Sequence, residues 1–370
     1  MLARNLRKEV ENRLGIADVR INSDRRWDLV VHDDRFYSRV VSQGALGLGE
    51  SYMDGWWDCA ELAQLFSKLL KAHLDRRLSI NWALILAYLN AKITNRQGKL
   101  LATENVHRHY DLGNDLYRNM LGRWMLYSSA NWEHAASLDE AGEAKLDFVC
   151  RRLNLRSGQK VLDIGCGWGG FAKYAAQKYG VRVVGITVSS EQASLARQIC
   201  SDLPVEIRYQ DYRELSEKFD HVVSLGMFEH VGYKNYRKYM KIVHRCLKPG
   251  GLFFLNTIGA NESGYCVNPW TDKYIFPGGM LPSIAQIGAA IDGLFVMEEL
   301  QDWAEYYDKT LVTWYQNFHA NWNKLKVRYN DRFYRMWKYY LLSSAGAFRS
   351  KTIQDWQIVL STNGNVDWVS

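Results

Sequence analysis

The sequence has no hydrophobic run long enough to cross a membrane. Its longest clean apolar stretch extends from Trp82 to Leu89 and is bounded by Asn81 and Asn90, whereas a membrane-spanning helix needs about 20 apolar residues. The opening residues MLARNLRKEV are charged and lack the apolar segment of a signal peptide. We therefore expect a cytoplasmic protein.

Paired cysteines are also missing. The 6 cysteines are scattered without a Cys-x-x-Cys pair, which argues against a metal cluster or a disulfide framework. His107 and His109 flank Arg108, but the further ligands of a zinc site do not accompany them. We expect reduced thiols and no bound metal.

Charge and aromatic content are informative without being specific. The net charge of +7 would attract nucleic acid, anionic lipid or acidic substrates alike, and no nucleic-acid recognition motif accompanies it. The chain holds 14 Trp and 22 Tyr residues. These aromatic side chains either pack a core or line a pocket for a lipid or a cation.

The 370 residues suit two domains. Residues 1–95 predict a small, mostly helical N-terminal domain, in which Gly47–Trp57 is expected to form a glycine-rich turn. The polar stretch Asn95–Lys99 marks the expected linker. Residues 96–370 form the second expected domain.

Strands and helices alternate from residue 158 onward. Helices are expected at Phe171–Tyr179, ended by Gly180, and after Ser189. Such alternation predicts a doubly wound α/β domain with a parallel sheet. The expected strands are Lys160–Ile164, Val181–Ile186, Val205–Tyr209, His221–Leu225 and Leu252–Thr257.

A glycine-rich loop, Gly165–Gly170, follows the first of these strands and precedes a helix. Its glycines match the G-x-G-x-x-G pattern of NAD enzymes, but Thr187 stands where a dinucleotide site has an acid that binds the ribose. Asp163, two residues before Gly165, gives the pattern Asp-x-Gly-x-Gly that is typical of S-adenosylmethionine (SAM) methyltransferases, as is Lys248–Gly251 before a strand. SAM is therefore the favoured cofactor.

Further motifs run through nearly the whole chain in a consistent order. With them, the sequence resembles the cyclopropane fatty acid synthases and the related mycolic acid cyclopropane synthases. The motifs are Gly47–Trp57, His109–Asn114, Leu126–Ala130, Val161–Gly170, Gly185–Gln192, Gln210–Tyr212, Gly226–Gly232, Tyr274–Gly278 and Tyr307–Leu311. The resemblance implies a Rossmann-like SAM-dependent methyltransferase that adds a methylene group to the cis double bond of an unsaturated phospholipid acyl chain.

The resemblance also implies which residues contact the cofactor. They are Tyr127, Ser128, Asp163, Gly165, Gly167, Thr187, Gln192, Asp211 and Tyr212. Two of these have structural alternatives. Ser189 and Gln192 have the spacing of a helix capping box, and Asp211 is also a common type of turn residue.

A sulfonium is a strong electrophile, and methyl transfer to an alkene leaves a carbocation that aromatic faces can stabilise. Ring closure then requires a base, and the resemblance implies a bound bicarbonate ion. Its expected contacts are Glu229, Tyr307, and the backbone at Ile258 and Ser129. The alternatives are a glutamate at a helix start for Glu229 and a packing aromatic for Tyr307.

Two positions depart from the family pattern. Asn256 replaces a histidine in the segment Asn256–Ile258, and Ser129 replaces a cysteine. Asn cannot titrate near neutral pH as His does. On sequence alone, Asn256 is expected to weaken or alter proton abstraction, and Asn256→His is expected to raise ring formation.

The predicted substrate requires docking on a phospholipid membrane, so peripheral association with its cytoplasmic face is expected. Cations recur along Lys324–Tyr340 beside an apolar stripe, which is typical either of a membrane-surface helix or of a helix that packs on the core. The family resemblance allows a homodimer formed through the N-terminal domain.

Three other activities remain open on sequence. The chain could add a methyl or methylene branch without closing a ring, it could methylate nitrogen or oxygen of a small molecule, or it could bind lipid or SAM without turnover. The N-terminal motif and the Glu229 segment argue against the small-molecule enzyme. Intact Asp163, Gly165, Gly167, Glu229 and Tyr307 argue against a protein without turnover.

Overall fold

The fold is described from a computed structural model, which covers residues 2–74, 113–264 and 267–362. The expected linker Asn95–Lys99, the domain boundary at residues 95 and 96, and most of the motif His109–Asn114 lie outside these residues. Among the described helices, none is both long and apolar enough to cross a membrane.

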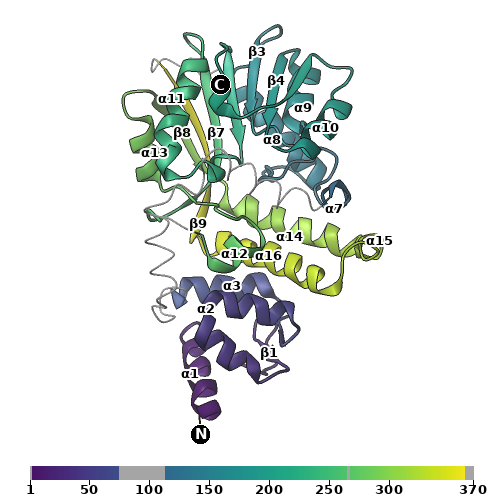
Figure 1. Ribbon diagram of the computed structural model, residues 1–370, viewed down its shortest axis with the longest axis vertical. Coiled ribbons are helices and arrows are strands. Elements are labelled where there is room, and N and C mark those ends of the chain that lie inside the picture. Colours follow the sequence, from purple (N-terminus) through teal and green to yellow (C-terminus); the bar gives the residue numbers. More distant parts are fainter. Residues whose placement is uncertain (1, 75–112, 265–266, 363–370) are drawn as a thin grey trace.

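A mixed sheet of 7 strands, in the order β5-β4-β3-β6-β7-β9-β8, forms the upper part of the molecule (Figure 1). Its strands are β3 (Lys160–Ile164), β4 (Arg182–Thr187), β5 (Val205–Tyr209), β6 (His221–Leu225), β7 (Leu252–Ala260), β8 (Val296–Asp302) and β9 (Ile353–Ser361). The strands expected from sequence, β3 to β7, pair in parallel. The sequence reading missed β8 and β9, which pair antiparallel at one edge.

Helices cover both faces of the sheet, as expected for a doubly wound fold. Their bounds are α8 (Leu138–Arg152), α9 (Gly170–Tyr179), α10 (Ser190–Ile199), α11 (Tyr236–Cys246) and α13 (Ile284–Ile291). Alternate residues of one strand enter opposite cores: Val161 packs with residues of α8 and α9, and Leu162 packs with residues of α11 and α13. The period of two in β-strands thus builds two apolar layers from one sheet.

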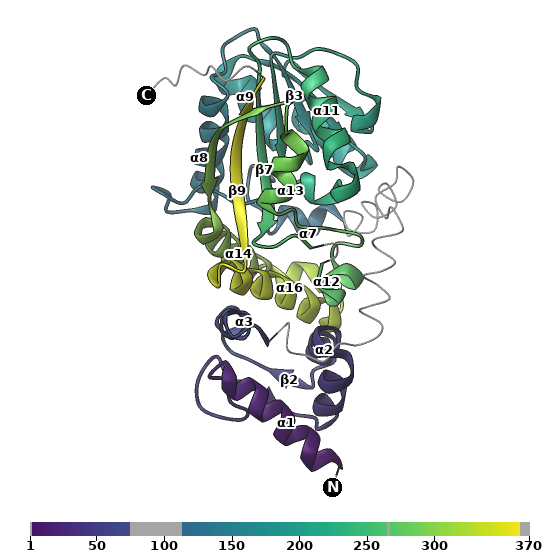
Figure 2. The same cartoon turned by 90° about the vertical axis from the view of Figure 1, so that its left-hand side faces the viewer.

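Below the sheet, two long helices separate it from an N-terminal helical layer (Figures 1 and 2). The long helices are α14 (Ala304–Ala320) and α16 (Asp331–Arg349), and the N-terminal layer contains α1 (Leu2–Ile16), α2 (Arg35–Met53), α3 (Leu62–Lys71), β1 (Val30–Val31) and β2 (Trp57–Asp58). The short helices are α7 (Asn114–Arg118), α12 (Pro269–Tyr274) and α15 (Trp322–Leu325). Helix α16 packs against α3 and α2, so the C-terminal part of the chain joins the N-terminal helices to the sheet.

The stretch Gly47–Trp57 is not the turn that its glycines suggested. Helix α2 continues to Met53, and its kink lies earlier, at Gly44. A Cβ on Gly47 would lie 2.4 Å from the Arg39 carbonyl oxygen, and one on Gly49 would lie 2.3 Å from the Trp270 ring. These glycines therefore permit close packing.

The stretch Lys324–Tyr340 is not one helix either. Helix α15 ends at Leu325, and α16 starts after Asn330, whose side chain accepts a hydrogen bond from the Phe333 amide. The three arginines of the stretch pair with acids on other elements: Arg332 with Asp54, Arg335 with Asp58, and Arg328 with Asp115. The apolar residues Leu325, Tyr329, Met336 and Tyr340 are buried. These contacts match the core-packing alternative for this stretch.

Candidate active site

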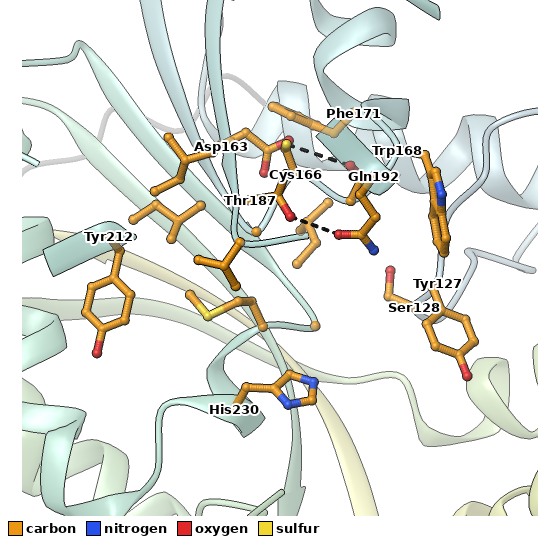
Figure 3. A pocket seen from close by; sticks show the side chains of 18 of the residues that line it. Tyr127, Ser128, Asp163, Cys166, Trp168, Phe171, Thr187, Gln192, Tyr212 and His230 are labelled. Carbon is orange, nitrogen blue, oxygen red and sulfur yellow. Dashed lines mark hydrogen bonds between the residues drawn. The ribbon is translucent and has the colours of Figure 1, made fainter. Parts of the chain in front are cut away.

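A cavity of about 130 Å³ lies at the carboxyl ends of β3, β4 and β6, where open α/β sheets place their ligands. Figure 3 shows its labelled side chains arranged around the open space. Every residue expected to contact the cofactor lines this cavity: Tyr127, Ser128, Asp163, Gly165, Gly167, Thr187, Gln192, Asp211 and Tyr212.

The glycine loop shapes one wall. Gly165, Gly167 and Gly169 have φ values of 83°, 53° and 84°, which glycine adopts without strain. A Cβ at Gly167 would meet no atom within 4 Å, whereas one at Gly170 would lie 2.1 Å from the Trp124 carbonyl oxygen. The loop thus leaves open space at Gly167 and brings the start of α9 close to a neighbouring segment.

Asp163 places a buried carboxylate on the cavity wall. It is 2% exposed, and its Oδ2 has no hydrogen-bond partner among the described residues. Burial raises the pKa of this carboxyl group to about 7. A cationic ligand would satisfy the oxygen and favour its ionised form.

Thr187, Gln192 and Asp211, which also line the cavity, form hydrogen bonds with nearby residues. Thr187 Oγ1 donates to Gln192 Oε1 at 2.9 Å, as Figure 3 shows, so the amide nitrogen of Gln192 can bind a ligand. The backbone amide of Gln192 donates to Ser189 Oγ, which caps α10, while the Gln192 side chain bonds to Thr187 and lines the cavity. Only the Ser189 half of the expected capping box is therefore present. Asp211 accepts from the backbone and the guanidinium of Arg213, as in the turn alternative, while it also lines the cavity.

A larger cavity of about 460 Å³ lies between the sheet and the N-terminal helices. It is walled mainly by apolar side chains from both parts of the chain, including Leu14, Phe36, Phe66, Phe276, Leu311 and Phe348. Tyr127, Gly226 and His230 line both cavities. The two spaces therefore meet at these residues.

Three of the expected reaction residues line the larger cavity: Glu229, Tyr307 and Ile258. Glu229 is 8% exposed, and its Oε1 accepts from the Ile258 amide at 2.6 Å. Its buried Oε2 has no partner among the described residues. Burial raises the pKa of Glu229 to about 7, although the hydrogen bond from Ile258 opposes the shift. The Ile258 amide, expected to hold an anion, is thus already bonded to Glu229.

Asn256 and Ser129 lie behind the cavity walls and line neither cavity. They are 1% and 0% exposed, and both side chains bond to Asp355. A direct contact between the Asn256 side chain and a reacting anion, as the sequence suggested, has no support in this geometry.

Sequence reasoning missed Lys145 and Asp355, which meet Ser128, Ser129 and Asn256 in one buried network. Neither belongs to a recognised motif, and a lysine inside a helix usually marks a solvent-exposed face. His230 was also missed as a cavity residue, although it follows Glu229 in a quoted motif. Its position next to Glu229 in the sequence could have indicated that it lies at the site.

The model of one protein family, described as mycolic acid cyclopropane synthetase, matches residues 97–358. The chain belongs to this family. It is 48% identical to the cyclopropane-fatty-acyl-phospholipid synthase of Escherichia coli strain K12, over 95% of this chain and 92% of that protein. It is 31% identical to the tuberculostearic acid methyltransferase UfaA1 of Mycobacterium tuberculosis, over 95% of this chain and 86% of that protein.

A solved family structure shares the fold. The crystal structure of mycolic acid cyclopropane synthase CmaA1 complexed with SAH and CTAB superposes with a TM-score of 0.66 and 31% identity, covering 70% of this chain and 97% of the other. With the family match, this likeness makes the chain a SAM-dependent methyltransferase with a Rossmann-like domain.

Proposed function

We propose that this SAM-dependent methyltransferase converts the cis double bond of an unsaturated phospholipid acyl chain into a cyclopropane ring. The observation that carries the proposal is the junction of the two cavities at Tyr127, Gly226 and His230. The smaller cavity lies at the glycine loop and is lined by the buried carboxylate Asp163. The larger cavity is walled mainly by apolar side chains, and its volume is within the usual range of ligand pockets. A methyl donor in the first could reach an alkene in the second.

The residues of the smaller cavity fit SAM. The unpartnered Oδ2 of Asp163 can accept a hydrogen bond from an ammonium group, and the N-terminus of α9 favours a carboxylate. In this proposal Thr187 and Gln192 would face the ribose, and Asp211 and Tyr212 would border the adenine; all four residues line the cavity. Bound SAM supplies an electrophilic methyl group.

The larger cavity suits the acyl chain and the charge that forms on it. Methyl transfer to the alkene leaves a carbocation on the lipid. Tyr127, Phe276 and Tyr307 present aromatic side chains to the cavity, and a desolvated cation–π contact is worth roughly 2 kcal/mol. The apolar walls also exclude water, which would otherwise capture the cation.

Glu229 Oε2 is unpartnered and buried, and Glu229 lies on the wall of the larger cavity, so its carboxylate can hold the O–H of a bicarbonate ion and take up the proton that ring closure releases through that ion. The raised pKa of Glu229, about 7, suits proton uptake near neutral pH. We include a bicarbonate ion in the proposal, held by Glu229 and Tyr307, and this ion would supply a base at the same wall. The Ser129 backbone stays a predicted contact for it.

The substrate requires the enzyme to reach lipid, so the proposal includes peripheral association with the cytoplasmic face of a membrane. Overall basic charge supports attraction to anionic lipid. A homodimer through the N-terminal helices is part of the same proposal and rests on the family resemblance alone.

A second candidate is the addition of a methyl or methylene branch to the acyl chain. Asn256 in place of the family histidine favours it, together with the likeness to a protein named as a tuberculostearic acid methyltransferase.

Product analysis separates the two candidates. Vesicles of unsaturated phospholipid are incubated with enzyme and SAM, with and without bicarbonate, and the lipid is studied by mass spectrometry and proton NMR. The proposal expects a gain of one methylene in mass, upfield ring protons, and a loss of product when bicarbonate is removed. The same mass gain without ring protons would establish branching.

A further inference from the structure

Lys145 is a fully buried lysine in the middle of α8, with 0% of its surface exposed. Lysine is almost never fully buried unless its ammonium group is paired. On the same helix, Arg151 pairs with Asp147 at the surface, and their side chains are 61% and 36% exposed. Specific partners in the interior must therefore hold Lys145.

Those partners form a continuous bridge. Lys145 Nζ donates to Ser128 Oγ at 2.7 Å and to Asn256 Oδ1 at 2.8 Å. Asn256 Nδ2 donates to Asp355 Oδ1 at 2.8 Å, and Ser129 Oγ donates to Asp355 Oδ2 at 2.5 Å. The side-chain amide of Asn256 thus links Lys145 to Asp355. Its oxygen accepts from the ammonium group, and its nitrogen donates to the carboxylate.

The bridge lies directly behind both cavities. Ser128 lines the smaller cavity. On β7, Asn256 is followed two residues later by Ile258, which pairs with Asp355 of β9 and donates its amide to Glu229 in the larger cavity. A movement of the bridge would therefore displace groups in both cavities.

The charges of the network are coupled. Burial lowers the pKa of Lys145 to about 8, while the negative charges of Asp355 and Glu229 raise it. Burial also raises the pKa of Asp355, and Lys145 is the main influence that opposes this rise. The attraction between the ammonium group and these two carboxylates thus opposes the effect of burial, which disfavours their charged forms.

We propose that Lys145 is a positioning residue for the transfer reaction, acting through Ser128 and through the Asn256–Asp355 bridge. Its ammonium group fixes the Ser128 hydroxyl at the wall of the smaller cavity, and its charge supports the anionic form of Glu229 beside the larger one. The role in turnover rests on the proposed function, whereas the role at Ser128 concerns cofactor binding and can be measured separately.

The bridge also links the two departures from the family pattern. Ser129 and Asn256 both bind Asp355, so these residues act as a set. In histidine, a ring carbon takes the place of Nδ2 of asparagine, so Asn256→His would leave Asp355 without that donor. The bridge therefore leads to a prediction opposite to the one made from sequence: Asn256→His alone should lower turnover.

The test compares three variants of the full chain: Lys145→Met, Lys145→Met combined with Asp355→Asn, and the surface control Arg151→Met. Thermal unfolding, SAM affinity by calorimetry and the pH dependence of kcat are measured for each. The double variant removes both charges, so it should regain most of the stability that Lys145→Met loses. It also carries the test if Lys145→Met alone fails to fold.

The proposal expects kcat of the double variant to stay at least about 100-fold below wild type, with SAM affinity about 10-fold weaker because Ser128 loses a charged donor. The decline of wild-type kcat as pH passes about 8 should be absent in the double variant.

Arg151→Met should match wild type. Recovery of stability, SAM affinity and kcat together in the double variant would overturn the proposal, since the lysine would then be structural. Failure of wild type to modify lipid would instead refute the proposed function. The SAM affinities of the variants would still test the proposed role of Lys145 at Ser128.

Discussion

The two carboxylate oxygens of Glu229 have different surroundings. Its Oε1 is fixed by the Ile258 amide at 2.6 Å, and its Oε2 is buried without a partner among the described residues. The first feature orients the group, and the second keeps it basic, because burial disfavours the charged form. The pKa of about 7 is the net result.

Glu229→Gln should lower kcat by at least about 100-fold. Glutamine keeps the acceptor for Ile258, but it cannot take up a proton. In wild type, kcat should rise as pH increases through about 7, because Glu229 becomes a carboxylate, and the residual activity of the variant should lack this rise. Initial rates measured across pH test this, and an unchanged pH profile in the variant would contradict it.

The same substitution should change stability with a defined sign. The pKa of Glu229 is raised from 4.5 to about 7 in the folded protein, so wild type loses stability as pH rises from 4.5 through 7. Glu229→Gln should therefore become progressively more stable than wild type over this range, by on the order of 3 kcal/mol at the upper end. Denaturant unfolding at several pH values measures the difference, and a difference independent of pH would be inconsistent with a buried titrating group.

At the scale of single elements, local patterns sufficed for the strands β3 to β7 and for α9 and α10. Alternating apolar residues, the glycine loop and the Ser189 cap are all local signals. Strand β8 was missed because its side chains are mostly half-buried or exposed, and Val296–Asp302 includes three acids. Helix α2 was misread because its glycines serve contacts with Arg39 and Trp270, one of which lies far along the chain.

Some residues of the candidate site follow from local sequence patterns, and others do not. The cofactor residues follow short motifs at strand ends, and all of them line one cavity. Lys145 and Asp355 lie 210 residues apart in the sequence and meet only through Asn256. No local pattern distinguishes such a pair from surface charges, so it required the structure.

Helix α16 offers a prediction about the attachment of the N-terminal helices. A Cβ on Gly346 would lie 2.6 Å from the Ala63 carbonyl oxygen and 2.6 Å from Phe66 Cβ, both on α3. Gly346→Ala should destabilise the protein by about 1–3 kcal/mol, since backbone must shift. Thermal unfolding measures this. Gly15→Ala is the matched control, because its Cβ would meet nothing within 4 Å, and equal effects at the two sites would refute the packing argument.

On the scale of the whole molecule, the larger cavity belongs to neither end of the chain alone. Leu14 and Phe36 come from the N-terminal helices, and Tyr307 and Phe348 come from the helices below the sheet. The views in Figures 1 and 2 place these layers one above the other. The N-terminal helices therefore complete the apolar cavity proposed for the acyl chain.

The net charge of +7 leads to a prediction about the membrane. The protein should sediment with anionic vesicles more than with neutral ones, and added salt should reduce the difference. Neutral phosphatidylcholine vesicles of the same size serve as the control. Equal binding to both lipids would argue against a basic docking surface.

The most direct test of the central claim uses SAM with a trideuterated methyl group and vesicles of unsaturated phospholipid. Ring closure must remove one deuteron from the transferred methyl group, so the lipid should gain a methylene with two deuterium atoms, and its alkene protons should disappear from the NMR spectrum. A product that retains all three deuterium atoms, or that keeps an alkene, would contradict cyclopropane formation.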